Sequence, residues 1–376
     1  MAFYKKNWAV TRLKKYFDHR GFLLRFGLSA VLLLFGFVAS AHQSNFVKTS
    51  DLTVEGEKTV KFALDWLFTG AHAPFVMAAD GGYFKKVGLN VVLENSVGAA
   101  DAVEKVASGK VDFGLADLPA LIAHNAKNPQ NPLTAFYLVN ERSPLSVMSL
   151  SERNIRTPKD LEGKRIGAPV SDAGRAMFAL FAAAAGINAS LIQWVDVEAQ
   201  FRESRLMMGE VDAITGFFTA AHFLELQGVP AENIQIIKFS DVGVNLYSLA
   251  LFARADYLAS KPALAQAFTR AINNALKDTI SKPEKALAFM PARIGNRFKT
   301  SIELKRLHLT LDQLVVTPFV RQYGLSVVDR QRLARNAADI TSALKLPTLA
   351  PLAVSALYSE NFLPSLAERQ VPQTTP

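Results

Sequence analysis

Cysteine is absent from the 376-residue sequence. Its absence excludes disulfide bonds, thiolate metal ligands, a cysteine nucleophile and attachment of a lipid to an N-terminal cysteine. A chain of this length, half of it hydrophobic residues, buries enough apolar surface to fold without disulfides. The lack of cysteine is therefore compatible with a soluble, exported protein.

The sequence also lacks the motifs that mark common catalytic and cofactor sites. It contains no P-loop, no GxGxxG after a strand pattern, no HExxH and no GxSxG. The six histidines are scattered without metal-ligand spacing. We therefore expect neither a cofactor nor a metal ion, and a protein that is not an enzyme.

Positive charge is scarce outside the N-terminus. The formal net charge is +9, but residues 1–41 contain seven basic residues and one acidic residue. The rest of the chain has a net charge of only +3, which gives no support for nucleic-acid binding.

The same N-terminal segment has the layout of an export signal. A basic region precedes an apolar run at residues 26–39, and Ala39-Ser40-Ala41 supplies the small residues that signal peptidase recognises. A run of fourteen residues is short for a membrane span, which needs about 20. We predict a signal peptide at residues 1–41 that is cleaved after Ala41, with an uncleaved membrane anchor as the alternative. The predicted location is the periplasm of a Gram-negative cell.

A block of the sequence occurs twice, about a hundred residues apart. Each copy contains three strand patterns separated by two helical patterns. Each second helical pattern ends at a glycine, and a Val-Asp pair follows after one intervening residue. The strand patterns of the first copy cover residues 60–65, 90–94 and 111–116, and its first helix covers residues 72–87. Those of the second copy cover residues 164–168, 192–196 and 211–216, and its first helix covers residues 173–185.

This duplication predicts the fold class, which is α/β. Each β-α-β-α-β block favours a mainly parallel sheet flanked by helices, so the chain should form two lobes with a ligand cleft between them. We expect lobe one to contain residues 58–140 and 246–365, and lobe two to contain residues 145–243. The two crossings between the lobes are candidate hinges for closure around a ligand. After a strand at 248–253, the last third should be helical over 261–281, 283–290, 304–314, 329–344 and 350–358.

Candidate ligand-binding residues of lobe one follow its strands. Ligands of open α/β sheets bind beyond the carboxyl ends of the strands. Asp65 and Trp66 follow the first strand, His72 starts the next helix, and Asp117 follows the third strand. The carboxylates can accept ligand N–H groups and the indole can stack on a planar ring. The alternatives are that Trp66 is core, that Asp65 caps a turn, and that His72 is structural.

In lobe two the matching positions are Ser171 and Asp172, which could bind a ligand or simply cap a helix. Arg175 could pair with an anionic ligand group or remain solvated. Phe217 and Phe218 follow the last strand of the second copy and could stack on a ligand or belong to the core. Asn245 and Tyr247, at the second crossing, could reach a bound molecule.

Six motifs together resemble one protein family. They are Leu64-Asp-Trp66 with His72, Gly82-Tyr-Phe84 with Gly88-Leu-Asn90, Gly109-Lys-Val-Asp112, Gly209-Glu-Val-Asp212, Gly243-Val-Asn-Leu-Tyr247 and Leu357-Tyr-Ser-Glu-Asn-Phe-Leu-Pro364. Over residues 58–365 the chain resembles the nitrate/sulfonate/taurine and thiamine-pyrimidine-precursor class of ABC-transporter substrate-binding proteins. The resemblance implies a type II periplasmic binding fold and a monomer that delivers a small solute to a membrane permease with a cytoplasmic ATPase.

Within that class, Asp65-Trp66 with His72 is most similar to the branch that binds thiamine pyrimidine precursors, such as the hydroxymethyl- and formylamino-pyrimidines. That branch usually continues with Pro-Asn, where this chain has Leu67-Phe68. The acidic candidates Asp65, Asp117 and Asp172 favour an amino-substituted ring over an anion. A sulfonate, taurine, nitrate, an aromatic carboxylate or a flavin remain alternative solutes. Two other classes also remain: a membrane-anchored sensory module, and an enzyme like the fungal thiamine-pyrimidine synthases, which carry a cysteine-rich segment.

Overall fold

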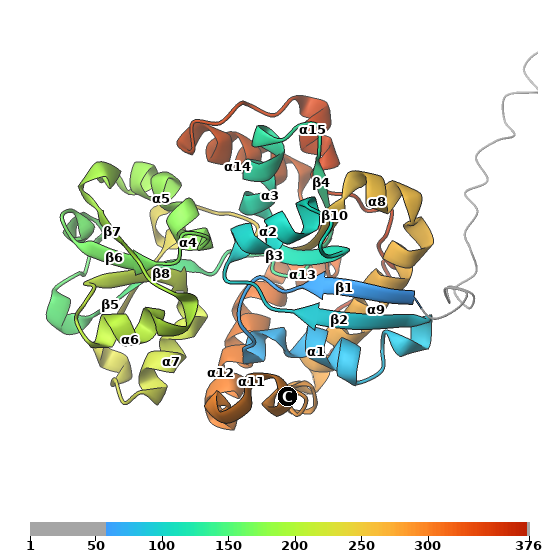
Figure 1. The fold of residues 1–376 in the computed structure, drawn as a ribbon, viewed down its shortest axis with the longest axis horizontal. Coiled ribbons are helices and arrows are strands. Elements are labelled where there is room, and N and C mark those ends of the chain that lie inside the picture. The colour runs from blue at the N-terminus through green and yellow to red at the C-terminus, as the bar shows by residue number, and fades with distance from the viewer. Residues whose placement is uncertain (1–57, 374–376) are drawn as a thin grey trace, which may run out of the picture. The chain divides into compact units, whose positions relative to one another are not determined.

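The computed structural model describes residues 58–373, which belong to one compact unit of the chain. The predicted signal peptide or anchor at residues 1–41 lies outside the described residues. Between residues 58 and 373, none of the helices combines the length and the apolar character that crossing a membrane requires. Figure 1 shows two separate sheets, each with helices packed around it.

The first sheet has five strands, and we call it and its helices lobe one. Their spatial order is β2 (Leu89–Glu94), β1 (Lys58–Ala63), β3 (Phe113–Asp117), β10 (Leu249–Arg254) and β4 (Leu133–Leu138). Strand β1 is parallel to β2 and β3, whereas β10 is antiparallel to both of its neighbours. The register places Leu249 of β10 opposite Asp117 of β3.

The second sheet, which defines lobe two, repeats this arrangement. Its order is β7 (Gln193–Asp196), β6 (Arg165–Ala168), β8 (Ala213–Phe217), β5 (Leu145–Leu150) and β9 (Ile234–Lys238). Here β5 is the antiparallel strand, again fourth in the order. The predicted α/β class, with two mainly parallel sheets, is confirmed.

The helices within the two copies are shorter than the sequence predicts. The helix expected over 72–87 is a 3-10 turn (Gly70–His72), α1 (Ala73–Asp80) and a second turn (Lys85–Val87). It breaks at Gly81-Gly82, where Gly82 has a φ of +82° that a helix cannot contain. The helix expected over 173–185 is divided at Met177 into α4 (Ala173–Ala176) and α5 (Phe178–Ala185). The remaining helices of the copies are α2 (Ala99–Ala107), α3 (Leu118–Lys127), α6 (Arg202–Met207) and α7 (Ala221–Leu226).

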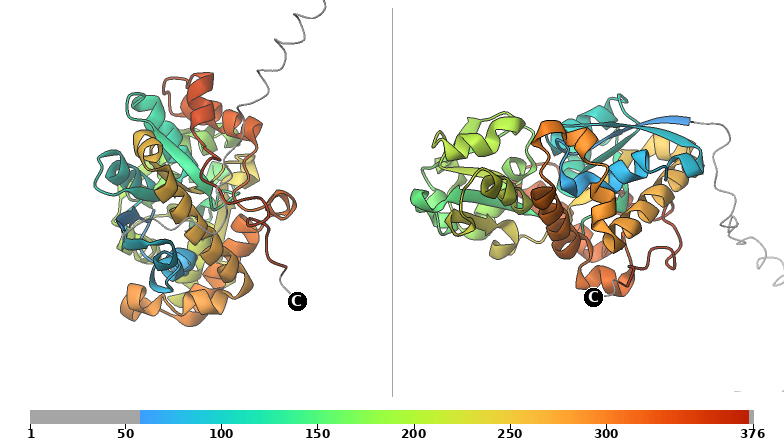
Figure 2. Two further views of the ribbon diagram at one scale, coloured as in Figure 1. Left: turned by 90° about the vertical axis from the view of Figure 1, so that its right-hand side faces the viewer. Right: turned by 90° about the horizontal axis from the view of Figure 1, so that it is seen from below.

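The C-terminal third is helical, as predicted, and packs largely on the first sheet. Strand β10 lies between β3 and β4, and the helices that follow it surround this sheet in Figures 1 and 2. Helix α12 (Thr300–Thr310) continues directly into a π-helical turn (Leu311–Val315). The helices are α8 (Ala255–Ser260), α9 (Pro262–Ser281), α10 (Pro283–Leu287), α11 (Pro291–Ile294), α12 (Thr300–Thr310), α13 (Pro318–Tyr323), α14 (Arg330–Ala343) and α15 (Pro351–Ala356).

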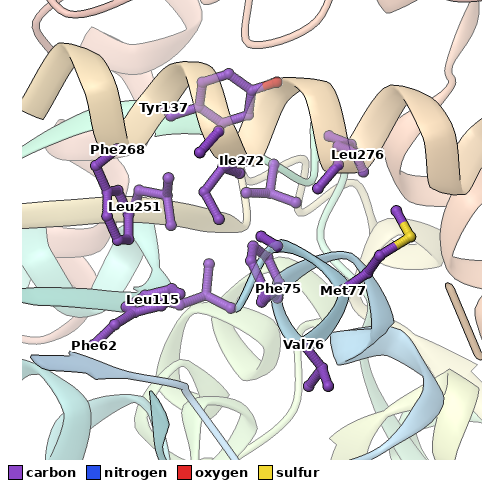
Figure 3. Close-up of a cluster of buried hydrophobic side chains, with 14 of the residues drawn as sticks. Phe62, Phe75, Val76, Met77, Leu115, Tyr137, Leu251, Phe268, Ile272 and Leu276 are labelled. Carbon is purple, nitrogen blue, oxygen red and sulfur yellow. The ribbon is translucent and has the colours of Figure 1, made fainter. Parts of the chain in front are cut away.

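Helix α9 anchors the core of lobe one. Phe268 and Ile272 of this helix are fully buried and face Phe62 and Leu115 of the sheet (Figure 3). The rings of Phe62 and Phe268 meet edge to face at 5.2 Å. Burying each such side chain stabilises the fold by about 1.5–3 kcal/mol. The carboxyl ends of β1 and β3 are thereby held on a rigid platform.

Candidate functional site

A cavity of about 130 Å³ lies where the carboxyl ends of strands from both sheets meet. Lobe one contributes Asp65, which follows β1, and Asp117, which is the last residue of β3. Lobe two contributes Asp172 after β6 and Phe217 at the end of β8. Helix α12 of the C-terminal third closes another side of the cavity. The parallel strands thus deliver polar groups from two distant sequence blocks to one place.

Asp65 and His72 form a buried pair on the lobe-one side. Their exposed fractions are 5% and 3%. The Nε2 of His72 lies 3.0 Å from an oxygen of Asp65. On the other side of the ring, Nδ1 accepts a hydrogen bond from the backbone N–H of Thr69, which leaves Nε2 as the donor to Asp65. The turn before α1 therefore orients the histidine, and the histidine occupies one oxygen of Asp65.

Trp66, which is half-buried, meets a side chain of the other lobe. The guanidinium carbon of Arg202 lies 4.8 Å from the indole centroid, within the range of a cation–π interaction. Arg202 is 4% exposed and fits against Gly216, where a Cβ would lie 2.8 Å from Nη1. One face of Trp66 is therefore covered by the guanidinium.

The charge of Arg202 is compensated within lobe two. Its Nε and Nη2 donate to Glu203, at 3.1 and 2.5 Å, and its Nη1 lies 3.5 Å from Asp172. Burial opposes the charged form, but Glu203 and Asp172 outweigh it and raise the pKa of Arg202. Asp172 also caps α4 by accepting the backbone N–H of Arg175, and it accepts the hydroxyl of Thr215 at 2.7 Å. Asp172 thus has the capping role that the sequence left open.

Asp117 lies at the end of β3 in a different environment. One of its oxygens accepts the hydroxyl of Ser248, and the other is buried without a hydrogen-bond partner. The side-chain oxygen of Asn140, a buried residue that also lines the cavity, likewise has no partner. Burial raises the pKa of Asp117 to about 7; the bond from Ser248 acts in the opposite direction, and the charges of Asp65 and Asp172 raise the pKa further.

Helix α12 adds a second buried ion pair to the cavity wall. Arg306 Nη1 donates to Glu303 at 3.1 Å, and Glu303 accepts the backbone N–H of Gly70 at 2.6 Å. Arg306 also donates through Nε to the carbonyl of Thr219 in lobe two, at 3.3 Å. This arginine therefore links the two lobes.

The rim of the cavity contains a very close contact between the lobes. The hydroxyl of Ser171 donates to the carbonyl of Val97 at 2.8 Å. Gly98 follows with a φ of +149°, and a Cβ there would lie only 2.3 Å from the carbonyl oxygen of Ser171. Glycine at this position thus allows the two lobes to meet.

The ten predicted site residues divide into two groups. Those that line the cavity are Asp65, Trp66, His72, Asp117, Asp172 and Phe217. Ser171 lies at the rim, and Asn245 is exposed with its amide directed to the carbonyl of Gly243. Phe218 is buried beneath Lys238, and the buried Tyr247 accepts the backbone N–H of Asp329. Arg175 pairs with Asp196 and lies over Trp194.

Sequence reasoning missed Asn140, Arg202, Glu203, Glu303 and Arg306, which all line the cavity. Arg202 and Glu203 begin a helix of the second copy. The signal available in the sequence was this pair of adjacent charged residues in a helix that needs an apolar face towards its sheet. No comparable signal marks α12, because its contact with the turn at Gly70 joins residues more than two hundred positions apart. Within the described part of the chain, no group of histidine and acidic side chains could hold a metal ion.

Comparisons with known proteins agree with this architecture. Residues 69–286 match the family described as NMT1/THI5 like. A formylaminopyrimidine-binding protein of Halalkalibacterium halodurans is 27% identical over 264 residues, which cover 70% of this chain and 77% of that protein. A 4-amino-5-hydroxymethyl-2-methylpyrimidine phosphate synthase of Aspergillus parasiticus is 27% identical over 294 residues, covering 75% of this chain and 81% of that enzyme.

One solved structure relates the fold to known architecture. The Candida albicans CA3427 gene product, described as having the generic periplasmic binding protein fold, matches with a TM-score of 0.60 and 16% identity. The match covers 85% of this chain and 99% of that protein. At this identity the likeness shows the fold alone, which is the one that the sequence predicts.

Proposed function

Since the chain belongs to the NMT1/THI5-like family, as its motifs predicted, we propose that it binds a small heteroaromatic solute of the thiamine-pyrimidine-precursor class. The observation that carries the proposal is a cavity enclosed by two lobes and lined by an indole and by buried hydrogen-bond acceptors. Such a combination suits a flat ring that bears amino groups. The formylaminopyrimidine-binding relative supports this choice.

The size of the cavity favours a single ring. An apolar cavity of about 150 Å³ admits benzene, and the cavity here measures about 130 Å³. A hydroxymethyl- or formylamino-pyrimidine, which has a single ring, has a volume of this order. A flavin, with three fused rings, would require the lobes to remain further apart.

The charges of the site disfavour an anionic solute. Arg202 and Arg306 are buried in the wall, and each is already bonded to a carboxylate. A sulfonate or nitrate would have to displace those carboxylates or enter beside the unpartnered oxygen of Asp117. An amino group meets neither obstacle, because it donates hydrogen bonds to carboxylates.

We propose binding rather than synthesis, although a synthase is among the relatives. The fungal thiamine-pyrimidine synthases that this chain resembles carry a cysteine-rich segment, whereas this sequence contains no cysteine. The export signal predicted at residues 1–41 supports the periplasm as the location. The partners would then be an ABC permease and its ATPase, with closure of the two lobes around the solute as the signal for delivery.

Calorimetric titration of the purified protein with the two pyrimidines tests this function. We expect one saturable site of micromolar affinity or tighter, and mass spectrometry should recover the solute unchanged. Trp66→Ala should weaken binding by about 1–3 kcal/mol. Trp194→Ala is the matched control, because Trp194 also lies under an arginine but does not line the cavity. Absence of binding to both pyrimidines, with binding to taurine or riboflavin, would contradict the proposal.

The transport part of the proposal has a separate test. N-terminal sequencing of the protein recovered from a periplasmic extract should begin at His42. Recovery of the whole protein in the membrane fraction, with residues 1–41 retained, would favour the anchored sensory module instead.

A further inference from the structure

Five carboxylates line the cavity, and all of them are buried: Asp65, Asp117, Asp172, Glu203 and Glu303. Four of them have a basic partner, which is His72 for Asp65, Arg202 for Asp172 and Glu203, and Arg306 for Glu303. Among the carboxylates of the described cavity wall, Asp117 alone has no basic side chain bonded to it. The cavity therefore contains one carboxyl group that has no basic side chain to neutralise it when it ionises.

The surroundings of Asp117 show which atoms remain to be satisfied. Asp117 is 1% exposed and lies opposite Leu249 in the register of β3 and β10. On the other side of β10, the backbone N–H of Asn140 donates to the carbonyl of Leu249. The backbone N–H of Ser248 in turn donates to the carbonyl of Asn140. Asp117 and Asn140 therefore flank the start of β10, and each presents a side-chain oxygen that has no partner.

Two such acceptors carry an energetic penalty. A buried polar atom without a hydrogen bond is unfavourable, and more so when it is charged. Neither oxygen is reached by solvent in this structure, and we expect water to reach both if the lobes move apart. A solute that enters the open cleft and brings its own donors would remove this penalty on closure.

We propose that Asp117 determines the specificity of the cleft by pairing with a cyclic amidine edge of the solute, that is, an amino group beside a ring nitrogen. This inference rests on the proposed function and assigns the contact to Asp117 rather than to Asp65 or Asp172. One proton is shared in the pair: an ionised carboxylate faces a protonated ring nitrogen, or a carboxylic acid donates to the neutral one. In both forms the amino group donates to Asp117, and its second N–H is available to Asn140.

The same geometry explains rejection of the oxo analogue. When Asp117 is ionised, replacing the amino group by a carbonyl turns a donor into an acceptor, which would face the acceptor oxygens of Asp117 and Asn140. Sites that hydrogen-bond a particular polar group discriminate by several orders of magnitude against analogues that lack it. The raised pKa of Asp117 is consistent with a group poised to share a proton.

The test compares calorimetric affinities for a pyrimidine and its 4-oxo analogue. At pH 8, where Asp117 is mostly ionised, the wild-type protein should prefer the 4-amino compound at least 100-fold, and Asp117→Leu, which removes both oxygens, should lower that preference at least 30-fold. Asp256→Leu is the matched control, since this exposed residue follows β10 at the opposite end of the strand. An unchanged preference in Asp117→Leu would overturn the inference and leave the proposed function standing.

Two further measurements test the inference if the Asp117 variant does not fold or if no pyrimidine binds. If Asp117→Leu does not fold, Asn140→Leu should lower the same preference about tenfold; an unchanged preference there counts against the inference. If no pyrimidine binds, the proposed function fails, and thermal shifts with benzamidine and benzamide test the amidine pairing separately. Stabilisation of the wild-type protein by benzamidine alone, lost in Asp117→Leu, supports the amidine pairing, and equal responses overturn it.

Discussion

The two lobes share one framework but differ in how their polar groups are satisfied. In lobe two, Asp172 and Glu203 are both bonded to Arg202 of the same lobe. In lobe one, Asp117 and Asn140 retain oxygens without partners. The duplication thus determines where polar strand ends meet, while the side chains that occupy those ends have diverged. Lobe two presents a wall whose charges are already paired, and lobe one presents the groups that need a ligand.

Breaking the ion pairs of Arg202 in lobe two should cause the largest loss of stability. Arg202→Met would leave Asp172 and Glu203 as buried carboxylates without a cation, which destabilises proteins by about 3–5 kcal/mol. Urea unfolding of the ligand-free protein measures this loss. Arg205→Met, three residues along the same helix, removes an exposed arginine from its partner Glu210 and should change the unfolding free energy by less than about 1 kcal/mol. Equal effects of the two substitutions would show that the Arg202 network does not stabilise lobe two.

The buried Asp117 of lobe one, which lacks a basic partner, should make the stability of the protein depend on pH. Burial raises the pKa of native Asp117 to about 7 from its ordinary value of 3.8. Between these values the native state holds a proton that the unfolded state has released. The unfolding free energy should therefore fall as pH rises, by about 1.4 kcal/mol per unit and about 2–4 kcal/mol in total between pH 4 and 8.

Asp117→Asn isolates this contribution from those of other titrating groups. The carboxylates of Asp65 and Asp172 act on Asp117 and remain in the variant. Unfolding free energies measured from pH 4 to 8 should decline less in Asp117→Asn than in the wild-type protein. Identical slopes would mean that Asp117 does not take up a proton on folding.

The contact between the lobes at the rim provides the next test. Gly98→Ala would place a methyl group 2.3 Å from the carbonyl oxygen of Ser171, so the lobes could not meet there. We expect solute affinity to fall about 10–100-fold, or about 1.4–2.8 kcal/mol. Gly163→Ala is the control, because Gly163 also has a positive φ but nothing within 4 Å of the added Cβ. If both variants bind equally well, closure does not bring these residues together.

The sequence predicted the fold and six of the residues that line the cavity for clear physical reasons. Strand patterns, the two copies and the strand ends follow from local apolar periodicity, so residues such as Asp65 and Asp117 could be placed near one another. Local pattern could not reveal that Arg202 covers Trp66 or that Glu303 reaches Gly70, because these contacts join different lobes or distant segments. It also could not tell a satisfied carboxylate, Asp172, from an unsatisfied one, Asp117. That difference depends on which partners the tertiary fold supplies.

The smallest expected effect concerns a salt bridge that joins the lobes at the surface. Lys305 of α12 lies 2.7 Å from Glu225 of α7, and the lysine side chain is half exposed. Exposed ion pairs contribute about 0.2–1 kcal/mol and weaken with salt. Lys305→Met should therefore lower solute affinity less than sixfold, and the difference from wild type should vanish in 0.5 M salt. An effect as large as that of Gly98→Ala, persisting in salt, would mean that charge pairing between the lobes, rather than close backbone contact, controls closure.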